Sequence, residues 1–333
     1  MKKLLAIMLA LLVCVGLTAC SNNGGKTEDP EEKTFVIGML NANRAEPWNV
    51  QMDADVEAAA SKYDNVKIVY KDCGGDASLQ RSQIEEFINS GVDGLLISPV
   101  EADPLTPVVE EAHNAGIPIV LISRNITSDA YDQYVCTDNF ALGYAAGQWV
   151  INNVGADAGV VMLNGLMTDG EGYDRALGFK RAIEGTDIEI LWEQDCQWDE
   201  AQGRSEMESV LSVVDPEKID VVFGGNDPTA HGAYVACQAA GVEEGIKFFG
   251  IDGLENEGRV YVDQGVFAMT IFDATGGDIA MDTMMDILSG KTVNKTYVKQ
   301  AIIFEKDTLT TGGTAVPAPD ASVDRTGQQI IID

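Results

Sequence analysis

Residues 94–124 read GLLISPVEADPLTPVVEEAHNAGIPIVLISR, a stretch that predicts a strand, a helix and a second strand in succession. The apolar runs at 94–97 and 117–122 are typical of strands that are buried on both faces of a sheet. Apolar residues between them recur at the spacing of one helix face, namely Leu105, Val108, Val109 and Ala112. Gly116 suits the left-handed backbone that ends a helix. Consecutive strands joined by such a helix run parallel.

The same alternation continues on both sides of this stretch, from Thr34 onwards. Further apolar runs that predict strands lie at 35–40, 66–70, 159–163, 188–192, 221–224, 247–250 and 267–271, with helical patterns between them. Such alternation is typical of parallel sheets covered by helices on both faces. About ten strands are more than one twisted sheet holds comfortably. We therefore predict an α/β fold with two doubly wound parallel-sheet lobes.

The N-terminus has the pattern of an export signal. It begins with the positively charged MKK, and the apolar run at 4–17 is short for a membrane-spanning helix. The tetrapeptide LTAC at 17–20 resembles the bacterial lipobox, in which the cysteine is lipidated; the alternative is an ordinary signal peptide with an incidental cysteine. We expect a signal peptide at 1–19, a lipid anchor on Cys20 and a flexible tether at 20–33. This predicts a lipoprotein on the outer face of the cell membrane.

The composition sets bounds on both size and partners. The chain has 333 residues, of which 45% are hydrophobic, enough for two folded domains. It carries 22 Lys and Arg against 53 Asp and Glu, a formal net charge of −31. So acidic a surface repels phosphate backbones and anionic lipid headgroups. The charge therefore excludes nucleic acid as a partner and favours solubility.

Four cysteines lie beyond the predicted anchor: Cys73, Cys136, Cys196 and Cys237. None forms a CxxC pair and the chain has only 2 His, so a zinc site is not expected. Export permits disulfides, and four cysteines allow three pairings. A core of this size needs no such crosslink, and we favour free, mostly buried thiols.

Polar and aromatic residues gather where the predicted strands end. In the first lobe these are Glu46, Trp48, Ser98 and Arg124, and in the second they are Asp169, Glu171, Arg175, Trp198, Asn226, Asp252 and Asp273. Ligands of open parallel sheets bind outside the carboxyl ends of the strands. Carboxylates accept hydrogen bonds, arginine donates through a planar fork, asparagine does both, and an indole covers the apolar face of a sugar ring. The set therefore indicates a site for a polyhydroxylated ligand.

Each of these residues also has a plainer interpretation. Trp48 could be only the first core contact of its helix, and Arg124 or Arg175 a partner in a surface salt bridge. Asn226 and Asp252 could cap the helices that follow them. Their shared position at strand ends favours the ligand site over these alternatives.

From Lys33 to about Leu309 the chain resembles the sugar-binding proteins of ABC transporters, in particular the galactose/glucose-binding and ribose-binding members. The resemblance rests on short motifs in a shared order: Glu46-Pro47-Trp48, Arg175-Ala176-Leu177-Gly178-Phe179, Trp198-Asp199-Glu200-Ala201-Gln202, Gly225-Asn226-Asp227, Gly250-Ile251-Asp252-Gly253 and Thr270-Ile271-Phe272-Asp273. It implies the type I periplasmic binding protein fold, in which two lobes enclose the sugar and three crossing segments join them. It places hinges near Thr137-Asp138, Asp273-Ala274 and Phe304-Glu305, with lobes at 34–137 plus 274–304 and at 138–273 plus 305–333.

Departures from the family pattern leave the identity of the sugar open. Ser98 stands where close relatives have Asn, and Ser123 stands where the ribose members have Asp. Asp169 or Glu171 would substitute for the His and Asp with which the galactose members contact their ligand. Residues 153–158 are too short and too poor in oxygen ligands for the calcium loop of those members, so no metal is expected.

Together these features predict a substrate-binding protein that has neither enzymatic activity nor a cofactor. A monosaccharide would close the lobes, and the closed monomer would dock on the permease of an ABC importer. An enzyme is disfavoured because the chain lacks G-x-S-x-G and HExxH motifs, and because His113 and His231 have no nucleophile nearby. A transcription regulator of this fold would need a basic helix-turn-helix in place of the export signal. A receptor subunit that reads a sugar or furanosyl signal, for chemotaxis or signalling, stays open.

Overall fold

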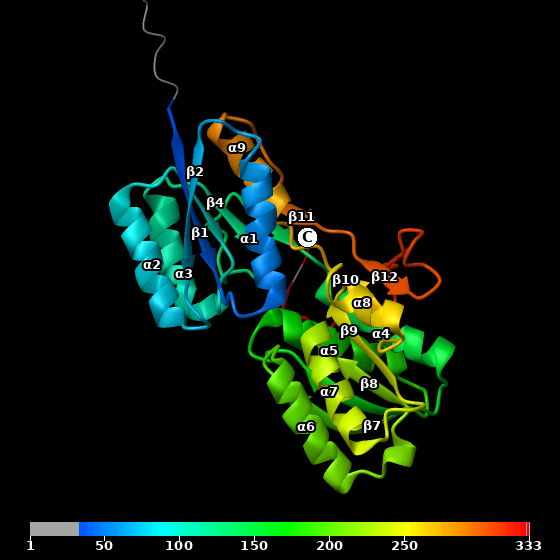
Figure 1. The fold of residues 1–333 in the computed structure, drawn as a ribbon. Coiled ribbons are helices and arrows are strands. Elements are labelled where there is room, and N and C mark those ends of the chain that lie inside the picture. The colour runs from blue at the N-terminus through cyan, green and yellow to red at the C-terminus, as the bar shows by residue number, and fades with distance from the viewer. Residues whose placement is uncertain (1–32, 331, 333) are drawn as a thin grey trace, which may run out of the picture. The chain divides into compact units, whose positions relative to one another are not determined.

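The structure is a computed structural model that describes residues 33–330 and 332 (Figure 1). Thr34–Asp333 form one unit and are described by themselves. The predicted signal peptide and Cys20 lie outside the described residues, as does the tether up to residue 32. Within the described part of the chain, no helix is both long enough and apolar enough to cross a membrane.

The first sheet of the described chain has six parallel strands in the order β11-β5-β4-β3-β1-β2. These strands are β1 (Phe35–Asn41), β2 (Val66–Asp72), β3 (Gly94–Ile97), β4 (Ile119–Ile122), β5 (Gln133–Cys136) and β11 (Thr296–Val298). Helices α1 (Pro47–Ala60) and α9 (Gly277–Leu288) cover one face, and α2 (Ala77–Ser90) and α3 (Ala102–Asn114) cover the other. The stretch at 94–124 forms β3, α3 and β4, which confirms the strand–helix–strand prediction.

The second sheet has seven described strands in the order β13-β12-β10-β9-β8-β6-β7. These strands are β6 (Gly159–Asn164), β7 (Glu189–Asp195), β8 (Val221–Gly224), β9 (Lys247–Asp252), β10 (Met269–Phe272), β12 (Ile302–Glu305) and β13 (Thr314–Ala315). Helices α4 (Asn139–Asn153) and α5 (Gly170–Ile183) cover one face, and α6 (Glu200–Val213) and α7 (Asp227–Ala240) cover the other. Helix α8 (Gly258–Gln264) follows β9. The fold class is therefore confirmed: α/β, with two doubly wound lobes.

Three segments cross between the two sheets in the described chain. The first, Thr137-Asp138, joins β5 to α4, and the second, residues 273–276, joins β10 to α9. The third is residues 299–301, between β11 in the first sheet and β12 in the second. It does not lie near Phe304-Glu305 as expected, because β12 pairs antiparallel with β10. Residues 302–304 therefore belong to the second lobe.

The C-terminal segment connects the lobes once more. Arg325 forms an ion pair with Asp138 in the first crossing. The carboxylate of Asp174 on α5 accepts hydrogen bonds from the main-chain nitrogens of Gln329 at 2.7 Å and Ile330 at 2.8 Å. The Ile330 side chain is buried in the core of the first lobe. A segment that was assigned to the second lobe thus completes the core of the first.

The four predicted thiols are buried, and the structure has them as free cysteines. Burial raises the pKa of Cys73 to about 11 and the pKa of Cys136, Cys196 and Cys237 to about 12. Because the thiolate is the reactive form, such thiols are chemically inert at neutral pH.

Candidate functional site

A cavity lies between the lobes, at the carboxyl ends of both sets of strands. It is lined by Glu46, Pro47, Trp48, Asn49, Ser98, Ser123, Arg124, Glu171, Arg175, Trp198, Asn226 and Asp252. All of the site residues predicted from the sequence are in this lining except Asp169 and Asp273, which lie directly behind it. In the described residues no group of His, Cys, Asp and Glu side chains is arranged to hold a metal ion.

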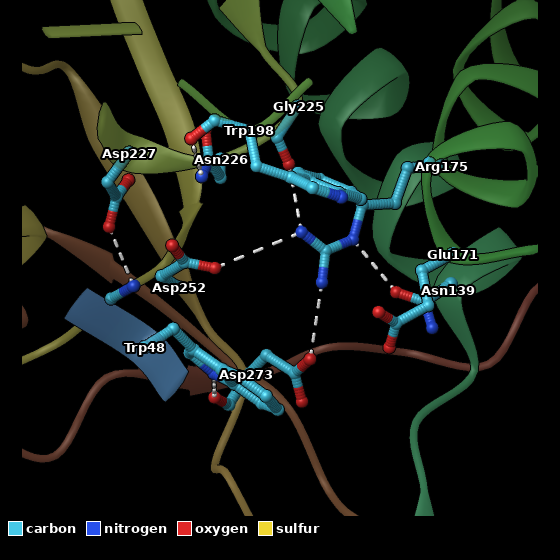
Figure 2. A network of polar contacts seen from close by, with 12 residues as sticks. Trp48, Asn139, Glu171, Arg175, Trp198, Gly225, Asn226, Asp227, Asp252 and Asp273 are labelled. Atoms are coloured by element: carbon cyan, nitrogen blue, oxygen red, sulfur yellow. Dashed lines mark hydrogen bonds and ion pairs between the residues drawn. The ribbon is translucent and has the colours of Figure 1, made fainter. Parts of the chain in front are cut away.

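Arg175 on α5 is the centre of the polar network in the cavity (Figure 2). Its Nε donates to Oδ1 of Asn139 at 2.8 Å, and its Nη1 donates to the carbonyl of Gly225 at 2.9 Å. Its Nη2 donates to Oδ2 of Asp273 at 3.3 Å, and Nη1 lies 3.9 Å from Oδ1 of Asp252. A guanidinium carries five N–H donors, so this fixed group still has a donor for a ligand.

The close approach of α4 to α5 brings Arg175 to Asn139. A Cβ at Gly143 of α4 would lie 1.8 Å from the carbonyl oxygen of Arg175, and a Cβ at Gly178 would lie 2.1 Å from the carbonyl of Phe140. Only glycine allows backbones to meet at such distances. These two glycines therefore determine where the guanidinium is seated.

Trp198 presents its indole to the cavity from the loop before α6. Its φ of 63° is a left-handed conformation that is rare for a tryptophan, and such residues gather at functional sites. The indole Nε1 donates to Oδ2 of Asp169 at 3.0 Å, and the Trp198 carbonyl accepts from Nδ2 of Asn226 at 3.0 Å. The ring lies 5.1 Å from the Arg175 guanidinium carbon. The three residues that contact Trp198 in this way, Asp169, Asn226 and Arg175, all belong to the second lobe.

Asn226 and Asp252 differ in whether they cap a helix, which is the alternative to a ligand contact for both. Asn226 caps α7, since its Oδ1 accepts from the Thr229 nitrogen at 3.1 Å, and it lines the cavity as well. Asp252 caps no helix, because α8 begins after Glu257. Its φ is 133°, another strained backbone in the lining.

Buried carboxyl groups surround Asp252. Burial and the neighbouring Asp227 raise the pKa of Asp252 well above its usual value, against the opposing effect of Arg175. Asp227 accepts hydrogen bonds from the Gly253 nitrogen at 2.7 Å and from the Thr270 hydroxyl at 2.8 Å, which fixes the Asp252 loop.

The first lobe contributes Trp48 and Glu46 from the start of α1. The Trp48 indole donates to the carbonyl oxygen of Asp273 at 2.8 Å (Figure 2). The carboxylate of Glu46 accepts from Asn43 at 3.0 Å and from Asn49 at 2.9 Å. Burial raises the pKa of Glu46 to about 7, although Arg124 opposes the shift.

An ionic bridge joins the lobes at the edge of the cavity. Arg124, which follows β4, lies 3.3 Å from Oδ2 of Asp169 through Nη2 and 3.2 Å from Oε2 of Glu171 through Nε. The hydroxyl of Ser123 donates to the other oxygen of Glu171. Although burial disfavours the charge of Arg124, the two carboxylates hold its pKa above the usual value. Arg124 is therefore a partner across the cleft and not in a surface salt bridge.

Sequence reasoning missed several residues of the site. Ser123 and Asn49 line the cavity, and Asn139 orients Arg175 from behind it. The position of Ser123 directly before Arg124, at the end of a buried strand, is a signal that could have identified it. Asn139 gives no such signal, because its role arises from contact with another helix.

Comparison with known proteins assigns the chain to a family. Residues 37–292 match the family model described as periplasmic binding protein domain. The ribose import binding protein RbsB of Bacillus subtilis is 30% identical over 301 residues, which are 89% of this chain and 96% of that protein. The galactofuranose-binding protein YtfQ of Escherichia coli is 30% identical over 240 residues, 69% of this chain and 74% of that protein. These relatives are solute-binding proteins and not enzymes.

Solved structures agree with this assignment. The fructose-binding periplasmic domain of a hybrid two-component system is 33% identical, with a TM-score of 0.79 over 83% of this chain and 92% of that one. A Mycobacterium smegmatis protein in complex with β-D-fucofuranose is 26% identical, with a TM-score of 0.77 over 84% of this chain and 93% of that one. The chain belongs to the periplasmic binding protein family and has its type I fold.

Proposed function

We propose that this chain is an exported sugar-binding protein that encloses one monosaccharide between its lobes and delivers it to the permease of an ABC importer. The observation that carries the proposal is the lining of the cavity, in which both lobes together contribute two indoles, two guanidinium groups, carboxyls and two amides. The relatives named for ribose, galactofuranose and fructose support a ligand of this class.

The chemistry of the lining suits sugar hydroxyls, each of which donates and accepts. Arg175 donates, Asn226 both donates and accepts, and Asp252 accepts. Trp48 and Trp198 offer apolar surface to the C–H faces of the ring. An incorrect epimer would leave one of these buried groups unpaired, at a cost of about 1–3 kcal/mol.

Hinge closure follows from a ligand that contacts both lobes, because only such a ligand binds the closed state more tightly than the open state. Trp48 and Glu46 come from the first lobe, and Arg175, Trp198 and Asp252 from the second. The closed monomer would present both lobes together to the permease.

A thermal-shift titration tests the proposal. Soluble protein covering residues 27–333 is titrated with ribose, galactose, glucose, fructose, xylose, arabinose and myo-inositol. A ligand at a hundredfold excess over its Kd stabilises the native state by about 2.7 kcal/mol, so the sugar that binds raises Tm clearly. A panel that leaves Tm unchanged would count against a sugar ligand.

Site variants test the assignment of residues to this function. We expect Trp198→Ala and Asp252→Ala to raise the Kd of the identified sugar about a hundredfold while the folded state persists. Asp263→Ala, an exposed carboxylate in the second lobe, serves as the control. Unchanged affinity in both site variants would contradict the assignment.

The lipid anchor is a separate part of the proposal and rests on the LTAC sequence before residue 21. We expect metabolically supplied palmitate to label the wild-type protein in cells. Cys20→Ser should lose the label and appear in the soluble exported fraction. A labelled Cys20→Ser variant would place the lipid elsewhere.

A receptor role is the alternative, and one observation favours it: the similar fructose-binding domain belongs to a two-component signalling system. Sugar-loaded protein that stimulates ATP hydrolysis by a reconstituted permease would support transport. Sugar-loaded protein that binds a sensor ectodomain and leaves the permease unaffected would support signalling.

A further inference from the structure

Asp273 lies where the three crossing segments meet, behind the cavity and not in its lining. It begins the second crossing and is only 1% exposed. Its Oδ1 accepts from the hydroxyl of Thr137, in the first crossing, at 2.5 Å, and lies 3.1 Å from Nζ of Lys299, in the third. Its Oδ2 accepts from Arg175 at 3.3 Å (Figure 2). One carboxylate thus contacts the other two crossings and the central arginine of the cavity.

Lys299 is the buried cation of this group, with 6% of its surface exposed. Besides its ion pair with Asp273, its Nζ donates to the carbonyl of Ala274 and lies 5.3 Å from the centre of the Trp48 ring. Its main-chain nitrogen donates to the carbonyl of Cys136 at 2.8 Å, next to the first crossing. A lysine is tolerated in such a place only because a carboxylate compensates its charge.

One aromatic and one cationic group of the lining, Trp48 and Arg175, contact this pair. The carbonyl of Asp273 holds the Trp48 indole and its carboxylate holds Arg175, so one residue supports a ligand-facing group from each lobe. Both oxygens of its carboxylate are already occupied by protein donors. Asp273 is therefore better placed to orient the site than to bind the ligand itself.

We propose that Asp273 and Lys299 form a charge pair that positions Arg175 and Trp48 and couples their position to the arrangement of the three crossings. The pair determines ligand affinity without touching the ligand, and both members are positioning residues. Because lobe closure moves the crossings relative to one another, a ligand that holds Arg175 in place also favours the closed arrangement of the hinge. This inference rests on the proposed function, since it assigns a role in binding.

Two single substitutions that each remove one charge, and a double substitution that removes both, test the pair. Lys299→Met leaves Asp273 with Arg175 as its remaining cation and draws the guanidinium away from the ligand, so the Kd should rise at least about tenfold. Asp273→Asn leaves Lys299 unpaired and should have a similar effect. The double variant removes both charges and leaves neither unpaired, so its loss of affinity should be smaller than the sum of the two single losses. Lys295→Met, an exposed lysine four residues away, should bind as the wild type does.

A second readout reports on the hinge without any sugar. Fluorophores on cysteines introduced at Leu79 in the first lobe and Val213 in the second, which are 45% and 69% exposed, give the distribution of distances between the lobes. Each single variant should broaden this distribution in ligand-free protein, and the double variant should narrow it again. Lys295→Met should leave it unchanged.

The outcomes separate this inference from the proposed function. If the wild type binds no sugar of the panel, the proposed function fails, while the ligand-free distance distributions still test the charge pair. Lys299→Met with the wild-type distribution overturns the coupling to the hinge. Lys299→Met with the wild-type Kd, or a double variant whose loss is the sum of the two single losses, overturns the role in affinity; a fall in Tm alone would mean that the pair only stabilises the fold.

Discussion

The two lobes hold their ligand-facing side chains in different ways. In the second lobe Arg175 bonds to Asn139, and Asn226 bonds to Trp198, so these groups are fixed by partners within their own lobe. In the first lobe Arg124 bonds to carboxylates of the second lobe, and the Trp48 indole bonds to a crossing segment. The second lobe is therefore largely preorganised. In the first lobe Glu46 is held by Asn43 and Asn49, but Arg124 and Trp48 have their partners outside the lobe.

This difference suggests an order of events in binding. The ligand meets the second lobe first, because a site that is already ordered loses little conformational entropy on binding. The first lobe then closes over the exposed side of the ligand and completes the ionic bridge. Substitutions in the second lobe should consequently reduce affinity most, and substitutions in the first lobe should act mainly on closure.

The largest effect is expected at the centre of the second lobe. Arg175→Ala removes the group that links Asn139, Asp252 and Asp273, and the Kd should rise at least about a thousandfold, or about 4 kcal/mol. Isothermal titration with the identified sugar measures the change. Arg181→Ala, which removes a partly buried arginine outside the cavity lining on the same helix, is the matched control. A loss below about tenfold would place the main contribution elsewhere.

The two tryptophans compare the lobes directly. Trp198→Ala removes an indole that is locked within its lobe, and we expect the Kd to rise about a hundredfold. Trp48→Ala removes an indole that is held by a single bond to the hinge, and we expect a rise of about tenfold. Titration of both variants with one sugar gives the ratio. The reverse ranking would mean that the first lobe is the preorganised one.

The ionic bridge should act on the lifetime of the complex. Arg124→Gln keeps a hydrogen-bond donor but removes the charge that meets Asp169 and Glu171, so the dissociation rate should rise about tenfold with little change in the association rate. Stopped-flow tryptophan fluorescence measures both rates. A change confined to association would show that Arg124 acts before closure.

At the boundary between the lobes we expect a pH dependence of stability. Burial raises the pKa of Glu46 from its usual 4.5 to about 7, so the folded state holds this proton more tightly than the unfolded state. The stability associated with the proton is therefore fully present below pH 4.5 and is lost as the pH rises through 7.

Paired denaturation curves isolate this contribution. Between pH 5 and 7 the free energy of unfolding of the wild type should fall by about 2 kcal/mol relative to Glu46→Gln, which has no carboxyl to titrate. Urea denaturation of both proteins at several pH values measures the difference. A difference that is independent of pH would mean that Glu46 titrates normally.

The sequence pattern predicts both sheets because a strand buried on both faces must be apolar along its whole length. Strands β3 and β8 have the predicted bounds, Gly94–Ile97 and Val221–Gly224. The site was predictable for a related reason, since parallel strands bring their carboxyl ends to one edge of the sheet. That rule predicts Arg175, Trp198 and Asp252 as site residues from the sequence.

The parts that could not be predicted depend on contacts between distant segments. Lys299 follows β11, in which Tyr297 and Val298 are 44% and 45% exposed. Nothing in so exposed a segment indicates that the lysine after it is buried. The sequence misplaces the third crossing because the antiparallel strand β12 has no helix directly before it to mark the change of sheet. Local periodicity carries no information on which strand a short apolar segment will join.

The C-terminal segment also bears on the order in which the chain folds. The other buried residues of the core that Ile330 completes lie between residues 40 and 136. Most of this core is therefore synthesised early, but its last residue is synthesised late. Helix α9 and strand β11, which the first sheet also needs, are likewise made after the strands β6 to β10 of the second lobe. Contacts of such long sequence separation form slowly and leave apolar surface exposed in the meantime. During synthesis and export, the second lobe is therefore expected to fold first, and the first lobe depends longer on chaperones.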